Sequence, residues 1–308
     1  MTVAFISHPE CRKHDMGTFH PECPARLDAI DDQLIASGVG ALLAPYEAPR
    51  AQTDQILRAH GRPYLESVLK AAPAHGIAHL DPDTAMCPDT LDAAFRAAGA
   101  GVLAADLVVG GKVKSAFCAV RPPGHHATRN KAMGFCIFNN IAVAALHALQ
   151  AHGLQRVAIV DFDVHHGNGT EDIFSEDSRV LMTGTFQHPF YPYSGTGNTA
   201  LNMANVPLAA GTDGQGFRAA FESVCLPRLE EFAPEMIFIS AGFDAHADDD
   251  MAMLMLKEAD YVWVTRRLRD IADQHAAGRM VSMLEGGYAL SALGRSVAAH
   301  IRVLLGID

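Results

Sequence analysis

Residues 157–168 read VAIVDFDVHHGN, an apolar run followed at once by a cluster of acidic and imidazole side chains. The run Val157–Val160 is rich in β-branched residues and lacks the alternation of a half-exposed strand, as expected of a parallel strand covered on both faces. Asp163 and His165 are two residues apart, so their side chains point the same way if the chain stays extended. The stretch therefore predicts a buried strand with ligand-type groups at its carboxyl end.

The same pattern of buried strands recurs along the chain, alternating with helical stretches. The other predicted strands are Val3–Ile6, Ala116–Val120, Val180–Thr183, Met236–Ser240 and Met280–Leu284. The predicted helices are Thr90–Val108, Asn140–His152, Gln215–Phe232, Lys257–Ala277 and Ser291–Leu305. This alternation predicts a single α/β domain over residues 1–308 with a doubly wound parallel sheet. The irregular stretches 7–26 and 185–214 are expected to be loops that shape a pocket.

Composition excludes several classes of protein. Of the 308 residues, 49% are hydrophobic and 19% are charged, which rules out a mainly disordered chain. The formal net charge of −11, with no basic block, argues against a nucleic-acid partner. No apolar run reaches the roughly 18 residues of a membrane span. The six scattered cysteines form no Cys-x-x-Cys pair, so we expect free thiols and a cytoplasmic protein with no membrane partner.

Four polar clusters each follow one of the predicted strands. They read RPPGHH (121–126), DFDVHHGN (161–168), AGFDAH (241–246) and EGGY (285–288). The carboxyl ends of parallel strands share one edge of the sheet, and ligands bind in the crevice outside that edge. We therefore expect the four clusters to converge on one site.

Two carboxylates and one imidazole in these clusters have the composition of a catalytic metal centre. Asp163, His165 and Asp244 supply three protein ligands and leave a coordination position open, which is the pattern of catalytic zinc. Such an ion polarises a carbonyl group and activates water. The sequence thus predicts one catalytic Zn²⁺.

Further residues of the clusters suit acid–base chemistry. His125 and His126 lie outside the ligand set and could act as general base and electrostatic partner, since neutral imidazole is the usual proton acceptor near pH 7. Tyr288 follows a Gly-Gly pair that permits a tight turn, and its hydroxyl could donate to a developing oxyanion.

The motifs RPPGHHA, DFDVHHGNGT, SAGFDAH and LEGGYAL, in this order, resemble the signature segments of the zinc-dependent histone deacetylase family. The resemblance is to its class II-like bacterial members and, more distantly, to bacterial acetylpolyamine amidohydrolases. It begins at His20 and covers nearly the whole chain. It implies the arginase/deacetylase fold, with a central parallel sheet of about eight strands flanked by helices.

The resemblance also implies a role for each cluster residue. The three ligands named above would bind the zinc. His126 would be the general base and then the acid, while His125 would stay largely protonated. Asp161 would orient His125, and Asn168 would be the partner of His126, as in class II members. Tyr288 would hydrogen-bond the substrate carbonyl.

Further residues would form the substrate tunnel by the same resemblance. Phe135 and Tyr191 match its aromatic walls, although phenylalanine is more usual at the second position. Gly134 would offer its carbonyl to the substrate amide, and Asp83 would be a rim carboxylate that holds the substrate. Met251 occupies a position where relatives that prefer acetylated polyamines can carry glutamate, and its thioether offers no charge.

The predicted activity is hydrolysis of acetyl or short acyl groups from acylated lysine side chains or related amines. The resemblance also implies a structural K⁺, bound near Thr185 by backbone oxygens of Asp161, Asp163 and His165. Acetylpolyamine hydrolysis is the main alternative. An arginase-like ureohydrolase and a non-catalytic module that binds acylated ligands are further ones. The expected partner is an acylated lysine peptide or a small acylated amine, and the oligomeric state is open.

Overall fold

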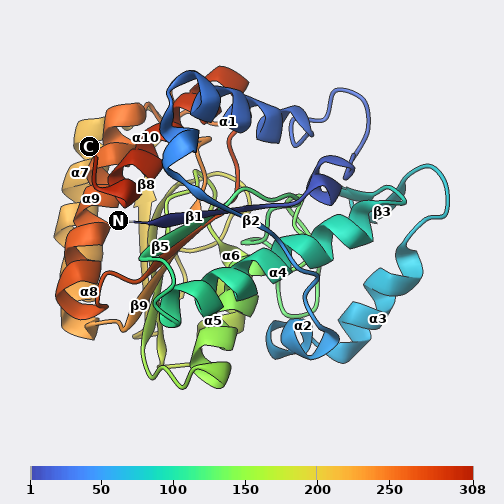
Figure 1. Cartoon of the computed structure of the whole chain (residues 1–308), viewed down its shortest axis with the longest axis horizontal. Coiled ribbons are helices and arrows are strands. Elements are labelled where there is room, and N and C mark those ends of the chain that lie inside the picture. Colours follow the sequence, from blue (N-terminus) through green and yellow to red (C-terminus); the bar gives the residue numbers. More distant parts are fainter. Residues whose placement is uncertain (1, 199, 308) are drawn as a thin grey trace.

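The computed structural model describes residues 2–198 and 200–307, which build a parallel sheet of eight strands (Figure 1). The strand order is β2-β1-β5-β10-β9-β6-β7-β8, and all neighbouring pairs are parallel. The strands are β1 Val3–Ser7, β2 Ala44–Glu47, β5 Ser115–Cys118, β6 Val157–Asp161, β7 Val180–Gln187, β8 Met203–Leu208, β9 Met236–Ala241 and β10 Met280–Leu284. Strand β10, late in the sequence, therefore fills the centre of the sheet between β5 and β9.

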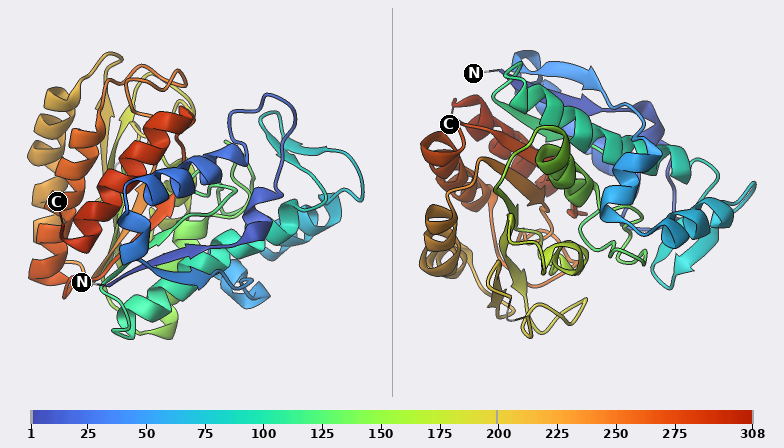
Figure 2. Two further views of the ribbon diagram at one scale, coloured as in Figure 1. Left: turned by 45° about the horizontal axis from the view of Figure 1, so that its top comes forward. Right: turned by 90° about the horizontal axis from the view of Figure 1, so that it is seen from below.

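Helices cover both faces of this sheet (Figure 2). Helix α4 packs against α5 and on strands β1, β5 and β10, whereas α10 packs between α1 and α9. The helices are α1 Ala25–Ala36, α2 Thr53–Ala59, α3 Arg62–Ala71, α4 Thr90–Val109, α5 Asn140–Ala151, α6 Asn168–Phe174, α7 Gly214–Ala220, α8 Leu226–Phe232, α9 Glu258–His275 and α10 Leu290–Leu305. A short antiparallel hairpin, β3 Ala78–Asp81 and β4 Thr84–Met86, lies outside the main sheet.

Small residues let α4 and α5 approach closely. A Cβ atom placed on Gly101 would lie 2.9 Å from Cβ of Ala144 in α5 and 2.9 Å from Sδ of Met283 in β10. Real side chains do not tolerate such contacts, so the glycine is required where the helix meets both its neighbour and the sheet. This packing fixes α5, whose first turn follows the loop that carries part of the site.

The predicted fold class is confirmed, and the six predicted strands are all present. Four strands were missed. Two of them, β3 and β4, form the separate hairpin, and the other two form the edges of the main sheet. Of these edge strands, β2 contains Pro45 and β8 contains Pro207, a residue that edge strands tolerate. The expectation that residues 185–214 are irregular is accordingly wrong at 185–187, which end β7, and at 203–208. The helix predicted at 215–232 is helical from Gly214 to Phe232, with one π-turn at Phe221–Cys225 between α7 and α8.

Two compositional expectations can be compared with the structure. All six cysteines are free thiols, and five of them are buried. Among the helices of residues 2–198 and 200–307, none is both long and apolar enough to cross a membrane.

Candidate active site

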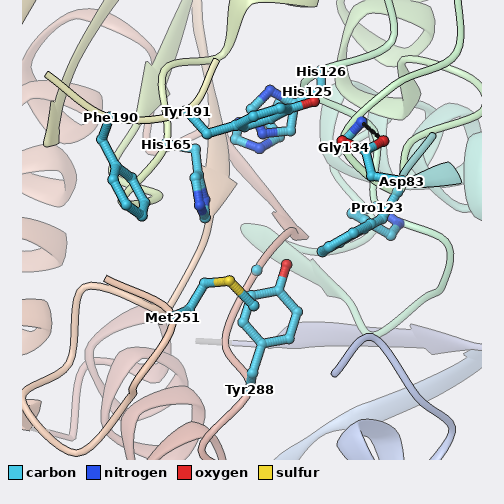
Figure 3. Close-up of a pocket in the computed structure, with 12 residues that line it drawn as sticks. Asp83, Pro123, His125, His126, Gly134, His165, Phe190, Tyr191, Met251 and Tyr288 are labelled. Atoms are coloured by element: carbon cyan, nitrogen blue, oxygen red, sulfur yellow. Dashed lines mark hydrogen bonds between the residues drawn. The ribbon is translucent and has the colours of Figure 1, made fainter. Parts of the chain in front are cut away.

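The segments that follow β5, β6, β9 and β10 meet around a cavity of about 210 Å³ (Figure 3). The predicted site residues that line it are Asp83, His125, His126, Gly134, Phe135, His165, Tyr191, Met251 and Tyr288. The other predicted site residues lie behind them, each within 3.2 Å of a lining histidine: Asp161, Asp163, Asn168 and Asp244. The structure therefore brings all the predicted residues to one edge of the sheet.

Asp163, His165 and Asp244 form a buried cluster at the base of the cavity. Nδ1 of His165 lies 2.9 Å from Oδ1 of Asp163 and 3.2 Å from Oδ2 of Asp244. One ligand atom from each of the three residues falls within 4.8 Å of the others. Backbone amides hold the remaining oxygens, since Gly286 N–H donates to Asp163 and Val164 N–H donates to Asp244.

The donor set and charge of this cluster fit a divalent cation. Oδ2 of Asp244 is buried and accepts no hydrogen bond from the described residues. Burial and the adjacent Asp163 raise the pKa of Asp244 to about 6. For His165, burial opposes protonation, but the adjacent carboxylates of Asp163 and Asp244 outweigh it and raise its pKa to about 9. The two buried carboxylates thus lie close together, and a bound cation would offset their negative charge. One nitrogen with two oxygens is a ligand set that Zn²⁺ accepts.

The hydrogen bond to Asn168 fixes the tautomer of His126. Oδ1 of Asn168 lies 2.7 Å from Nδ1 of His126, while its Nδ2 lies 3.3 Å from Sδ of Met133. An amide oxygen only accepts, so Nδ1 carries the proton and Nε2 keeps a lone pair. Burial and the nearby positive charges of His125 and His165 hold the pKa of His126 well below its usual range. His126 is therefore poised as a neutral proton acceptor.

His125 lies beside His126 but in the opposite electrostatic environment. The two ring centroids are 4.0 Å apart. Nδ1 of His125 lies 2.9 Å from Oδ2 of Asp161. Burial disfavours the charged ring, but Asp161, Asp163 and Glu285 outweigh that effect and raise its pKa well above the usual range. One histidine of the pair is thus kept charged and the other neutral, an arrangement typical of acid–base sites.

Tyr288 faces the cluster from across the cavity (Figure 3). Burial and the charge of Asp244 raise its pKa well above the usual value, so the hydroxyl stays protonated and can donate a hydrogen bond. The guanidinium of Arg26 lies 5.0 Å from the ring centroid, and its Nε donates to the Gly287 carbonyl at 2.7 Å. Arg26 therefore contacts the Tyr288 ring directly and also fixes the backbone of Gly287, the residue that precedes the tyrosine.

Aromatic rings line the approach to the cavity. The ring of Tyr191 packs edge-on to His126 at 5.3 Å between centroids, and Phe135 packs edge-on to Tyr288 at 6.1 Å. Gly134 has φ +57°, and a Cβ there would lie 2.3 Å from Cδ2 of His126, so this position excludes any side chain. The contact places the backbone of this glycine against the ring of His126.

Asp83 and Met251 occupy the rim. Oδ1 of Asp83 accepts hydrogen bonds from Gly134 N–H at 2.9 Å and from the Thr84 hydroxyl at 2.8 Å, so this carboxylate supports the tunnel wall. Its role in holding a substrate stays a prediction. The thioether of Met251 faces the cavity, and its backbone N–H donates to Oδ1 of Asp249 at 3.0 Å.

Comparison with known proteins decides the family. A sequence model of the histone deacetylase domain matches residues 20–304. The chain belongs to the histone deacetylase family. It is 38% identical to the histone deacetylase-like amidohydrolase of Pseudomonas aeruginosa, over 88% of this chain and 73% of that protein. It is 35% identical to a probable deacetylase of Archaeoglobus fulgidus, over 100% of this chain and 88% of that one. The crystal structure of the HDA15 HD domain superposes with a TM-score of 0.93 at 35% identity, covering 100% of this chain and 90% of that chain.

Besides Pro123 and Gly286, which line the cavity, three residues at this histone deacetylase-type site were not predicted. The ring of Phe190 stacks on His165, with centroids 5.4 Å apart. Glu285 and Asp249 are buried carboxylates that accept hydrogen bonds from backbone amides of the site. Position gave a signal for each, because Phe190 precedes a predicted wall residue, Glu285 follows β10 and Asp249 lies in an acidic run beside Met251. Their partners are rings and backbone atoms that no sequence motif specifies.

A second histidine–aspartate cluster lies outside the cavity and is complete without a metal. Nε2 of His147 and Nε2 of His152 lie 2.8 and 2.7 Å from Oδ1 of Asp106. Arg58 approaches Nδ1 of His147 at 2.7 Å, and a guanidinium only donates. The proton of His147 therefore sits on Nε2 and points to Asp106, which leaves no lone pair there for a cation. The cluster ties α2, α4 and α5 together.

Proposed function

We propose that the protein is a zinc-dependent deacetylase that hydrolyses the amide of acetylated or short-acylated amines, with acylated lysine side chains as the main substrate class. The observation that carries the proposal is the meeting of Asp163, His165 and Asp244 with His126 and Tyr288 at the base of one aromatic-walled cavity. Family membership supports the reaction class. The geometry supports the assignment of roles to particular residues.

Asp163, His165 and Asp244 would hold the zinc. A bound Zn²⁺ supplies Lewis acidity and lowers the pKa of water in its open coordination position. The rest of the catalytic work falls to side chains of this chain. We assign to His126 the removal of a proton from the attacking water at Nε2, because Asn168 holds the proton on Nδ1. The same nitrogen then returns a proton to the leaving amine.

His125 and Tyr288 stabilise charge in this scheme. His125, kept positive by its carboxylate neighbours, favours the negative charge that develops at the attacked carbonyl. The Tyr288 hydroxyl donates to the same oxygen, and its raised pKa keeps that proton in place at neutral pH. Both groups are fixed before substrate arrives, which is the condition for efficient electrostatic stabilisation.

The tunnel suits an alkyl chain that ends in an amide. Phe135 and Tyr191 offer apolar faces to the methylene groups of lysine, and we assign to the Gly134 carbonyl a hydrogen bond from the substrate amide. Met251 brings no charge to the rim, which favours acyl-lysine over a substrate with a distal ammonium. Asp83 would contact the substrate backbone through its second carboxylate oxygen.

We further assign the whole of residues 1–308 to one catalytic domain that works in the cytoplasm. The interleaving of early and late strands in one sheet supports the single domain. A structural K⁺ would lie behind the site, where Asp161, His165 and Thr185 line a small cavity. Asp163, the third residue expected to offer a backbone oxygen, does not line it.

An acyl-amine panel tests the proposal. The purified protein is assayed with acetyl-lysine peptide, acetylspermidine, acetylputrescine and arginine, and its metal content is measured on the same sample. We expect one zinc per chain and fastest turnover of the peptide. Faster turnover of acetylspermidine would reassign the enzyme to polyamines. Urea release with two manganese ions would indicate a ureohydrolase. Binding of the peptide without turnover, in zinc-loaded protein, would indicate a binding module.

A further inference from the structure

Behind the two site histidines lies a buried carboxylate to which the proposed chemistry assigns no contact with the substrate. Oε2 of Glu285 accepts hydrogen bonds from the backbone N–H groups of Gly124 at 2.6 Å and His125 at 3.1 Å. Its Oε1 lies 3.1 Å from the hydroxyl of Ser240. The side chain is 1% exposed. Glu285, the first residue after β10, therefore connects the segment that follows β5 with Ser240 of strand β9 behind the cavity.

The first turn of helix α6 fixes the carbonyl group of His125. The carbonyl of His125 accepts hydrogen bonds from Gly169 N–H at 3.0 Å and Thr170 N–H at 3.1 Å. The same helix begins at Asn168, the partner of the His126 ring. The backbone of His125 is thus fixed at its amide by Glu285 and at its carbonyl by α6. Together these contacts set where both imidazoles point.

We propose that Glu285 is a positioning residue for deacetylation, whose hydrogen bonds to two backbone amides hold the His125–His126 pair in its working geometry. The inference rests on the proposed function. Buried N–H groups are paired almost without exception in folded proteins, so loss of this acceptor forces the loop to move. A displacement of about 1 Å at reacting groups costs on the order of 100-fold in rate.

Two near-isosteric variants separate hydrogen bonding from charge. In Glu285→Gln the side-chain carbonyl can accept both backbone N–H groups, while the NH₂ donates to the Ser240 hydroxyl. Burial raises the pKa of Glu285 to about 7, against the opposing charge of His125, so the amide has the hydrogen-bonding capacity of the protonated acid. Glu285→Leu keeps the volume but removes both acceptors.

The test compares kcat, KM, bound metal and the NMR signals of the histidine imidazoles in wild type and both variants, with acetyl-lysine peptide as substrate. We expect Glu285→Gln to stay within about threefold of the wild-type kcat, because its hydrogen bonds are kept and the larger effects of Asp161 and Asp163 still favour the charged form of His125. Glu285→Leu should lose about 100-fold in kcat with KM unchanged and metal bound, since the Glu285 side chain bonds Gly124, His125 and Ser240 and not the tunnel walls or the metal ligands. Its imidazole signals should shift, and those of the glutamine variant should not.

A folded, metal-loaded Glu285→Leu enzyme with wild-type kcat would overturn the inference. So would a glutamine variant as slow as the leucine variant, because the charge would then carry the effect. If Glu285→Leu does not fold, Glu285→Asp provides the test. Its carboxylate keeps the charge, but the side chain is too short to reach the two backbone amides. A wild-type kcat in Glu285→Asp would then contradict the inference. If wild type turns over no acyl-amine, the proposed function fails, and unchanged imidazole signals in the leucine variant would separately refute the positioning role.

Discussion

The backbone N–H of Tyr288 donates a hydrogen bond of 2.6 Å to Oδ2 of Asp249, a residue 39 positions earlier in the chain. The same oxygen accepts from Ala289 N–H at 2.9 Å, and Oδ1 accepts from Met251 N–H at 3.0 Å. Asp249 is buried, with 5% of its surface exposed. The Asp249 carboxylate therefore fixes the backbone of both Tyr288 and the rim residue Met251.

Asparagine cannot replace Asp249, because all three partners are donors. Whichever way the amide of Asp249→Asn turns, its NH₂ faces a backbone N–H and leaves that group unpaired. We expect the free energy of unfolding to fall by about 1–3 kcal/mol and kcat to fall about tenfold or more. The exposed neighbour Asp250→Asn is the matched control and should leave both unchanged. Wild-type stability and kcat in Asp249→Asn, measured by denaturant titration and peptide assay, would contradict the clamp.

The acid limb of the pH profile should report His126. Burial and neighbouring positive charges hold its pKa well below 6.5, so the ring stays neutral as the pH falls and the acid limb of kcat/KM lies below pH 6.5. Asn168→Asp places a carboxylate at Nδ1, which favours the charged ring and should move this limb upward by about 1–3 units. At low pH the variant is then slower than wild type. An acid limb at the same pH in both enzymes would show that Asn168 does not face the base.

Removal of the Tyr288 hydroxyl should affect the rate far more than binding. In Tyr288→Phe the donor to the carbonyl oxygen is lost, and we expect kcat to fall by about 100- to 1,000-fold while zinc content and KM change little. Tyr193→Phe is the control, because that ring is 76% exposed. Elemental analysis and the peptide assay are run on the same samples. Wild-type turnover by Tyr288→Phe would remove the residue from the mechanism.

Stability should decline below neutral pH through His60. Its Nδ1 lies 3.0 Å from the Thr128 carbonyl and its Nε2 accepts from Asn139 N–H at 2.9 Å, so the ring is held neutral. Burial lowers its folded pKa to about 4 from an unfolded value near 6.5. The unfolded chain therefore binds the proton first, and on the order of 3 kcal/mol is lost as the pH falls from about 6.5 to 4.

His60→Gln should remove most of that dependence. The amide of glutamine can supply the same donor and acceptor but does not titrate, so its unfolding free energy should change less between pH 6.5 and 4. His75→Gln, at an exposed position, is the control and should keep the wild-type slope. Denaturant titrations at several pH values measure the slopes. Equal slopes for His60→Gln and wild type would place the acid sensitivity elsewhere, for example at the buried His300, whose pKa burial lowers to about 3.

The metal-binding and catalytic residues that could be predicted from sequence share one property: each lies at or soon after the carboxyl end of a strand. Parallel strands bring their carboxyl ends together, so Asp163 and Asp244 could be expected to meet although 80 residues separate them. The edge strands β2 and β8 could not be recognised, because each contains a proline. Asp249 and Glu285 were missed as positioning groups because their partners are backbone amides. Every residue except proline has such an amide, so no residue type in the sequence marks the partner. The hydrogen bond between Asp83 and Gly134 N–H depends on the β3–β4 hairpin, which no sequence motif predicts.

The place of β10 at the middle of the sheet has a consequence for synthesis on the ribosome. A nascent chain that has emerged only through β9 holds two incomplete groups of strands, with the facing edges of β5 and β9 unpaired. Tyr288 and Glu285 follow β9 in the sequence and have not emerged at that stage, so such an intermediate can neither close the central gap of its sheet nor complete the proposed site. The last strand of the sheet and the tyrosine of the proposed site therefore emerge almost together. A chain that ends before β10 would lack Tyr288 and would expose unpaired strand edges, which favour aggregation.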